Sequence, residues 1–177
     1  EVDFDCAVFT KLTQDHLDYH ITMDKYFEAK SKLFTSLNNA KTGNKLAVIN
    51  ADDDYAIRFI DKVPKGVKIL LYGIENKADF VAKNIKYSAK GASFICVTPQ
   101  GEKEVNLKMT GKFSVYNALA ALAAGVGYGI SIDKCIETLE NASGVAGRFE
   151  TVITEPLVIV DYAHTPDGLS NVLNAAR

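Results

Sequence analysis

The sequence predicts an α/β fold in which a mostly parallel sheet is flanked by helices and extended by a small antiparallel hairpin region. Short apolar runs at 6–10, 46–50 and 67–72 are separated by helical patterns, and this alternation is typical of parallel βαβ units. The segments 92–98 and 104–110 instead mix apolar and polar residues at near period two, with turn residues between them. That pattern favours an antiparallel hairpin with one solvated face.

Composition and charge limit the classes of function. The 177 residues suit one domain, or one domain and a piece of another. Apolar residues make up 47% of the chain and charged residues 24%, which is a soluble globular balance. The formal net charge is −2 with no basic block, so nothing favours nucleic acid or an anionic membrane as a partner. No apolar run approaches the roughly 18 residues of a membrane span.

The cysteines and the chain ends give two further expectations. Cys6, Cys96 and Cys135 are widely scattered and form neither a disulfide framework nor a metal motif. We expect buried thiols in a reducing cytosol, and therefore a cytoplasmic protein. The chain opens on Glu1 directly before the first strand and ends on Arg177 inside a helical pattern, which suggests a fragment of a longer protein.

The first long helix is expected to follow the first strand and to run to Leu37. Thr22 suits its N-cap position. Apolar residues recur at helical spacing from Tyr26 onward, and Lys30 falls on that apolar face while Lys32 falls off it. A lysine there either places its stem along apolar surface with its ammonium in water, or has a partly desolvated amine. A neutral amine can add carbon dioxide and become a carbamate, which is an oxygen ligand for a hard cation.

A dense group of acidic and histidine residues precedes this helix. Asp15, His16, Asp18 and His20 lie within six positions of one another. Such a group is compatible with a metal ion near Lys30. One interpretation is therefore a metal-dependent hydrolase that uses these four residues, which would bind zinc tightly.

Asn117 is the one amide in a helix that is otherwise apolar almost all round. This helix is expected over 113–125, buried, with Gly125, Gly127 and Gly129 ending it. The amide either satisfies a neighbouring backbone group or serves a ligand, and spacing alone leaves both possibilities open.

Two loops near the end carry further candidates. Ser131 suits the N-cap of a helix to about Ala142, and Arg148 lies in the glycine-bounded loop after it. Arg148 is either a lone surface arginine or a forked donor for phosphate. Asp161 follows the apolar strand 157–160. Open parallel sheets bind ligands at such strand ends, so Asp161 is a candidate for contact with a ribose or with a water on magnesium.

His164 lies in the same segment as Asp161. It could cap the last helix or act indirectly on a ligand. Thr165 as N-cap and Pro166 in the first turn mark where that helix begins.

Several of these segments together resemble the central domain of the Mur ligases. The matching motifs, in family order, are Thr-Gln-Asp-His-Leu-Asp-Tyr-His (13–20) with Tyr-Phe-Glu-Ala-Lys (26–30), Asn-Ala-Leu-Ala-Ala (117–121), Gly-Arg-Phe-Glu (147–150) and Asp-Tyr-Ala-His-Thr-Pro-Asp (161–167). The resemblance covers essentially the whole chain but only the middle of the enzyme. It is strongest to the members that add the third residue of the peptidoglycan stem peptide.

The resemblance implies site residues and cofactors. The lysine matching Lys30 is carbamylated and the histidine matching His16 binds magnesium, and both serve catalysis. Asn117, Arg148, Asp161 and His164 would contact ATP, with Asn117 near the adenine. The implied cofactors are therefore ATP and Mg²⁺.

The resemblance also implies a reaction and a domain organisation. ATP would phosphorylate the D-glutamate carboxylate of UDP-MurNAc-L-Ala-D-Glu, and an amino acid, diaminopimelate or lysine, would attack the acyl phosphate. Diaminopimelate is favoured as the commoner case, and a monomer is expected. Residues 1–155 would be the central ATP-binding domain, truncated at its N-terminus, and 156–177 the start of a C-terminal Rossmann-like domain.

Some features depart from the family. No Gly-x-x-x-x-Gly-Lys-[Ser/Thr] phosphate loop occurs in the sequence, so the chain alone is expected to be inactive. Lys11 replaces a usual asparagine, Ile21 a common glycine and Ala146 a common proline. Folylpolyglutamate synthetase, which shares this central domain, remains an alternative, although its metal loop has a different Asp-His spacing.

Overall fold

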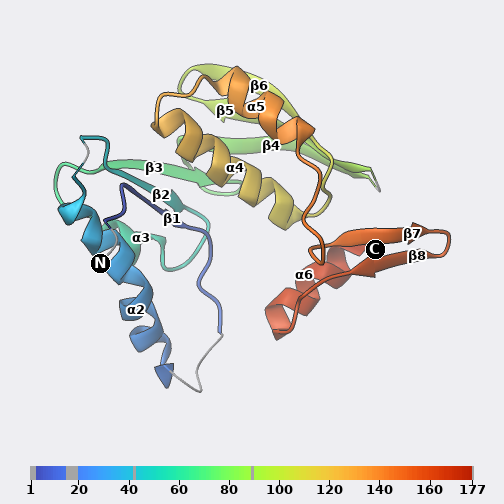
Figure 1. Ribbon diagram of the computed structural model, residues 1–177, viewed down its shortest axis with the longest axis horizontal. Coiled ribbons are helices and arrows are strands. Elements are labelled where there is room, and N and C mark those ends of the chain that lie inside the picture. Colours follow the sequence, from blue (N-terminus) through green and yellow to red (C-terminus); the bar gives the residue numbers. More distant parts are fainter. Residues whose placement is uncertain (1–2, 15–19, 42, 89, 177) are drawn as a thin grey trace.

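The computed structural model describes residues 3–14, 20–41, 43–88 and 90–176. Six strands build one sheet and two more build a small second sheet (Figure 1). In chain order the elements are β1 (Cys6–Phe9), α2 (Met23–Ser36), the 3-10 turn η1 (Leu37–Asn39), β2 (Leu46–Asn50), α3 (Ala56–Ile60), β3 (Lys68–Gly73), β4 (Phe80–Ser88), β5 (Gly91–Thr98), β6 (Gly101–Leu107), α4 (Lys112–Gly127), α5 (Ile132–Asn141), β7 (Glu150–Thr154), β8 (Leu157–Val160) and α6 (Pro166–Ala176).

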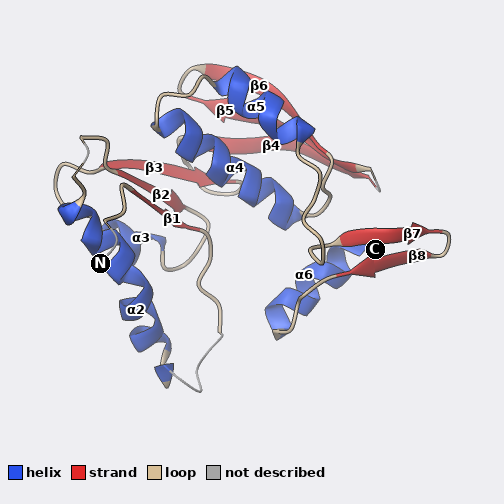
Figure 2. Ribbon diagram, viewed as in Figure 1, coloured by secondary structure: helices blue, strands red, loops and turns tan. Residues whose placement is uncertain are grey.

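The larger sheet is mixed, and its strand order follows the sequence from β1 to β6 (Figure 2). The pairs β1–β2, β2–β3 and β3–β4 are parallel, whereas β4–β5 and β5–β6 are antiparallel. The predicted α/β class and the predicted hairpin are therefore confirmed. Strand β4 lies between the parallel and the antiparallel parts of the sheet, because it is parallel to β3 on one side and antiparallel to β5 on the other.

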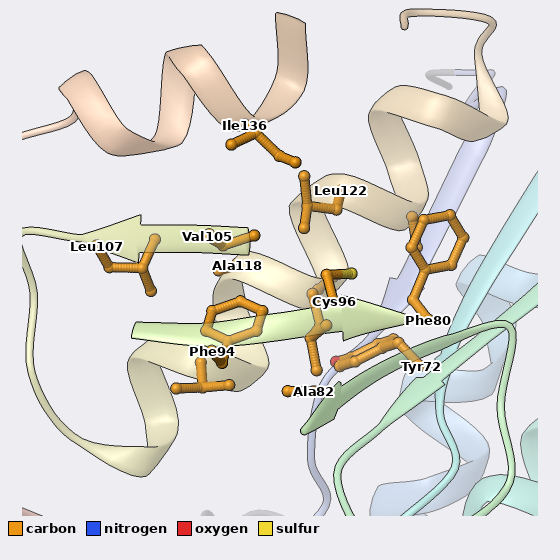
Figure 3. Packing of buried hydrophobic residues seen from close by; sticks show 14 of the residues in the cluster. Tyr72, Phe80, Ala82, Phe94, Cys96, Val105, Leu107, Ala118, Leu122 and Ile136 are labelled. Atoms are coloured by element: carbon orange, nitrogen blue, oxygen red, sulfur yellow. The ribbon is translucent and has the colours of Figure 1, made fainter. Parts of the chain in front are cut away.

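Helices cover both faces of the sheet, and the side chains of β2 point alternately toward the two layers of helices. Successive side chains of a strand point to opposite faces. Leu46 and Val48 pack into the core beneath α4, while Ala47 and Ile49 pack into the core beneath α2. All five residues of β2 are buried, so this strand lies at the centre of the domain. Figure 3 shows the α4 side of the core, where Tyr72 and other residues of β3–β6 meet α4 and α5.

Of the three glycines predicted to end α4, Gly127 is its last residue, whereas Gly125 lies inside the helix and Gly129 follows it. Helix α4 runs to Gly127, with Gly129 in a left-handed conformation beyond it at φ 87°. A Cβ on Gly127 would lie 2.4 Å from a methyl carbon of Leu46, and a Cβ on Gly125 would lie 2.6 Å from the Cys135 sulfur. The glycines are therefore needed because α4 approaches β2 and α5 closely.

The C-terminal strands differ from the expected parallel arrangement. Strand β8 pairs with β7 in an antiparallel sheet of two strands, separate from the larger sheet. Val158 and Val160 are 36% and 45% exposed, so the apolar character of this strand does not reflect burial among the described residues. Asp161 thus follows a hairpin strand, and the expectation that it ends a strand of a parallel sheet is wrong for this part of the chain.

The described helices and cysteines settle two smaller points. None of the described helices is long and apolar enough to cross a membrane. Cys96 is buried, and burial raises the pKa of its thiol to about 12. Cys6 and Cys135 are only partly buried, so the expectation of buried thiols is confirmed for Cys96 alone.

Candidate functional site

A pocket of about 970 Å³ lies between the start of α4 and the segment that runs from β8 into α6. Its volume is in the range of small-molecule sites. Asn117, Arg148, Asp161 and His164, the four residues expected to contact ATP, all line it. They come from a helix and two loops, so the fold brings together residues that are up to 47 positions apart (117 to 164).

Asn117 faces the pocket because its helix is buried on the other side. Its neighbours Ala118 and Leu119 are 3% and 0% exposed, whereas Asn117 itself is exposed. Among the described residues, no hydrogen bond satisfies its side-chain amide. Asn117 therefore does not satisfy a neighbouring backbone group in this structure, and its amide is available to a ligand.

A tight turn presents Arg148. Gly147 and Phe149 on either side have positive φ values of 70° and 47°. The backbone N–H of Gly147 donates to Glu150 Oε2 at 2.7 Å, and the N–H of Arg148 donates to the Val145 carbonyl at 3.0 Å. These hydrogen bonds close the turn, and the side chain of Arg148 at its tip lines the pocket.

The Arg148 guanidinium lies over an aromatic ring. Its Cζ is 5.0 Å from the centroid of the Tyr162 ring, within the range of a cation–π contact. A second aromatic pair, Phe113 with Phe149 at 5.7 Å, joins the start of α4 to the same turn. Sequence reasoning missed Tyr162 and Phe113. Tyr162 lies inside a matched motif, whereas Phe113 looks like any apolar core residue at the start of a helix.

Asp161 ties the two loops of the pocket together. One carboxylate oxygen accepts the backbone N–H of Phe149 at 2.7 Å, and the other accepts the N–H of Ala163 at 2.6 Å. The N–H of Tyr162 donates in turn to the Gly147 carbonyl at 3.0 Å. The carboxylate therefore organises the pocket lining, and each oxygen keeps a second lone pair for a ligand.

His164 is exposed beside Tyr162. Its Nδ1 is 3.0 Å from the Tyr162 carbonyl oxygen, and the two rings meet edge to face at 5.2 Å. Thr165 caps α6, because its Oγ1 accepts the N–H of Gly168 at 3.1 Å. The capping role considered for His164 therefore belongs to Thr165, as the position of Pro166 indicated.

Lys30 lies elsewhere. It borders a separate cavity of about 290 Å³ between β1 and α2. The side chain is exposed, and its Nζ lies 4.9 Å from the Tyr26 ring centroid, with His20 stacked on the same ring at 4.8 Å. His16 falls outside the described residues. Lys30 and the four pocket residues therefore belong to two different parts of the surface.

Of the acidic and histidine group that precedes α2, the structure describes only His20. Asp15 and Asp18, like His16, lie outside the described residues. Within residues 3–14, 20–41, 43–88 and 90–176, no three His, Cys, Asp or Glu side chains gather to hold a metal ion. A metal site can therefore be proposed here only from the resemblance.

Asp52, which sequence reasoning missed, anchors the helix that carries Asn117. It follows β2 and accepts backbone N–H groups of Ile74 and Asn76 at 2.6 and 2.7 Å, and the Tyr116 hydroxyl at 2.8 Å. Burial alone would raise the pKa of Asp52, but these hydrogen bonds and one from Glu75 outweigh burial and lower it. No sequence signal marked Asp52, because its donors are more than 20 residues away.

The structure is an α/β domain with a candidate small-molecule pocket where it meets a C-terminal βα segment. The model of the Mur ligase middle domain matches residues 1–125, which is more than half of the chain. The chain therefore belongs to the Mur ligase family.

Individual relatives agree with this assignment. A protein of Bacillus velezensis named UDP-N-acetylmuramoyl-L-alanyl-D-glutamate–2,6-diaminopimelate ligase is 51% identical over 179 aligned residues, which cover 99% of this chain and 36% of the relative. A solved structure of a ligase with the same name is 37% identical with a TM-score of 0.81, and covers 98% of this chain and 36% of that one. MurF from Acinetobacter baumannii is 26% identical with a TM-score of 0.87, over 98% and 38% of the two chains. The chain thus spans about a third of these proteins.

Proposed function

We propose that this chain is the nucleotide-binding part of an ATP-dependent ligase of peptidoglycan precursor synthesis. The ligase would add a third amino acid, meso-diaminopimelate, to UDP-MurNAc-L-Ala-D-Glu. The observation that carries the proposal is the convergence of Asn117, Arg148, Asp161 and His164 on one pocket in a chain of this family. The name of the 51% identical relative supports the substrate and the choice of diaminopimelate over lysine.

The pocket residues have distinct proposed roles. Asn117, with its free amide on α4, is placed to pair with the polar edge of an adenine base. Arg148 offers a planar guanidinium with several donors for phosphate oxygens. Asp161 holds the walls together through its backbone bonds and keeps lone pairs for a ribose hydroxyl. His164 borders the nucleotide from the side of α6.

The proposed metal site rests on the resemblance to the family. We propose that His16 and a carbamate on Lys30 hold Mg²⁺, which would neutralise charge on a phosphoryl group in transfer. Lys30 lies on α2 and is exposed, so its amine is accessible to carbon dioxide. The remaining ligands and the phosphate loop would come from outside this chain.

The proposed reaction forms an amide bond in two steps. A carboxylate oxygen of the substrate bonds to the γ-phosphorus, and ADP departs. The amine of the amino acid then attacks the acyl carbon, loses a proton and expels phosphate from a tetrahedral intermediate. In this scheme the residues of the chain orient the nucleotide, and positioning supplies much of the rate acceleration.

The proposed division of the chain is a central domain over 1–155 and the start of a C-terminal domain over 156–177. The separate sheet of β7 and β8 supports a division in this region. Because β7 (Glu150–Thr154) pairs with β8, it would move with the C-terminal part.

The test is phosphate release by the full-length protein that contains this chain. ATP and UDP-MurNAc-L-Ala-D-Glu are supplied with diaminopimelate or with lysine, for wild type, Lys30→Ala and the matched control Lys32→Ala. Turnover with diaminopimelate, lost in Lys30→Ala and kept in Lys32→Ala, is the expected result. Turnover only with a folate and glutamate would replace the proposal with the folylpolyglutamate alternative. Residues 1–177 alone are expected to give no turnover, and tightly bound zinc in that chain would favour the hydrolase.

A further inference from the structure

One ion pair joins α6, which carries one wall of the candidate pocket, to the segment that follows β1. Lys11, just after β1, places its Nζ 2.7 and 2.8 Å from the two carboxylate oxygens of Asp167 in the first turn of α6. Between the described residues of 3–141 and those of 150–176, it is the one hydrogen bond or ion pair that forms. Neither residue lines the pocket.

Lys11 is held in place on both sides along the backbone. Asn50 at the end of β2 donates its side-chain N–H to the Thr10 carbonyl at 2.8 Å, and Asp53 accepts the backbone N–H of Leu12 at 3.0 Å. Asn50 is only 6% exposed, so this attachment is part of the core. The ammonium of Lys11 therefore projects from a rigid point rather than from a free loop.

Asp167 belongs to the element that carries one wall of the pocket. The pocket is lined on this side by 161–165 and by Gly168, which flank Asp167 in the chain. Asp167 also accepts the side-chain N–H of Asn171 at 3.1 Å, which fixes its carboxylate on α6. Any shift of α6 changes the separation between this wall and Asn117 on α4.

We propose that Lys11 is a positioning residue for the nucleotide pocket. Its ion pair with Asp167 sets how closely the pocket lining of 161–172 (the α6 wall) approaches the lining of 108–117 (the α4 wall). It thereby sets the affinity for the adenine nucleotide, although Lys11 does not contact the nucleotide. This inference rests on the proposed function. It also gives a role to the lysine that stands where the family usually has asparagine, a side chain that cannot form an ion pair.

The pair should matter for the pocket more than for global stability. Lys11 and Asp167 are 47% and 39% exposed, and exposed ion pairs add little to stability. Ala175 of α6 also packs near Gly111 at the start of α4, but among the described residues the Lys11–Asp167 pair is the one polar contact between 3–141 and 150–176, so even a weak pair shifts the position of α6. Salt screens such a pair, which gives a further readout.

The experiment measures the dissociation constant of ADP with the full-length protein by calorimetry at low salt. The variants are Lys11→Met, Asp167→Asn, the double variant and Lys11→Arg. Lys134→Met is the control, because it removes another exposed ion pair, within α5 and away from the pocket. We expect Lys11→Met and Asp167→Asn each to weaken ADP binding about twofold to fivefold. The double variant should be no weaker than either single variant, and Lys11→Arg should bind as the wild type does.

Two readouts separate positioning from a structural effect. The melting temperature should be unchanged in Lys11→Met, and the difference from wild type should shrink at about 0.5 M salt. Unchanged ADP affinity in Lys11→Met, or additive effects in the double variant, would overturn the inference while leaving the proposed function intact. Failure of the wild type to bind ADP would overturn the proposed function and this inference with it.

Discussion

The carboxylate of Asp161 accepts the backbone N–H of Phe149 at 2.7 Å, and this bond joins the turn that presents Arg148 to the segment that leads into α6. The other oxygen of Asp161 is occupied by the N–H of Ala163. A carboxylate first considered for its contact with a ligand therefore also builds the wall of the pocket.

Asp161→Asn should weaken nucleotide binding. The amide replaces one accepting oxygen with an N–H₂ donor, which opposes a backbone N–H donor and releases one of the two loops. We expect the dissociation constant of ADP to rise about tenfold, equivalent to roughly 1.4 kcal/mol. Calorimetry on the full-length protein measures it, with Glu155→Gln in the exposed β7–β8 turn as the control. Equal affinity in Asp161→Asn and wild type would remove Asp161 from the site.

Tyr162 should act on the nucleotide through Arg148. Its ring lies 5.0 Å from the guanidinium, and a contact of this kind at an exposed site contributes about 0.5–1 kcal/mol. Tyr162→Leu should therefore weaken ADP binding by about twofold to fivefold, whereas Tyr162→Phe keeps the ring and should bind normally. If both variants weaken binding equally, the hydroxyl rather than the ring is important, and the proposed contact is wrong.

Asp52 should make stability depend on acid. Its folded-state pKa lies below the ordinary value of 3.8, so the folded chain binds fewer protons than the unfolded chain. The stabilisation is thus fully present above about 3.8 and is lost as the pH falls through the folded value. Because the carboxylate is only partly buried, we expect Asp52→Asn to lower the free energy of unfolding by about 1 kcal/mol at pH 7.

Urea unfolding of the chain at pH 7 and near pH 3 checks this prediction. The difference in the free energy of unfolding between wild type and Asp52→Asn should become smaller as the solution is acidified. Asp54→Asn, an exposed aspartate in the same turn, should match the wild type at both values. A gap that stays constant with pH would show that the charge of Asp52 is not what stabilises the fold.

Gly127→Ala should destabilise the chain although alanine favours helices. The added Cβ would lie 2.4 Å from a methyl carbon of the buried Leu46 and 3.1 Å from a methyl carbon of Leu70, so both side chains would have to shift. Overpacking of this kind costs about 1–3 kcal/mol, more than the roughly 1 kcal/mol that alanine gains over glycine in a helix. Thermal unfolding measures the difference. Gly144→Ala, whose Cβ would meet nothing closer than 3.7 Å, is the control and should be near neutral.

Features that depend on neighbours in the sequence were predictable. Thr22 and Ser131 cap their helices as expected, because each cap needs only a backbone N–H three residues along. The parallel strands followed from short apolar runs separated by helical patterns, and the hairpin followed from its period of two. The motif residues Asn117 and Arg148 were found, and the fold places both at one pocket.

Features that depend on distant partners were not predictable. The backbone donors to Asp52 lie more than 20 residues away in the sequence. The separation of β8 from the larger sheet depends on the arrangement of the whole chain and not on the local pattern of 157–160. The close approach of Leu46 to Gly127, which is 81 positions further along the chain, is likewise not visible in the sequence. Local patterns thus identified the elements and the candidate residues, and the structure supplied the contacts between them.

The central claim is that the pocket between α4 and α6 binds an adenine nucleotide, and photolabelling tests it most directly. The full-length protein is irradiated with 8-azido-ADP, with and without excess ADP, and the labelled peptides are mapped by mass spectrometry. The account predicts label within 108–117, 143–151 or 161–172, suppressed by ADP and reduced in Asn117→Ala. Label that ADP suppresses but that lies only outside these three segments would contradict it.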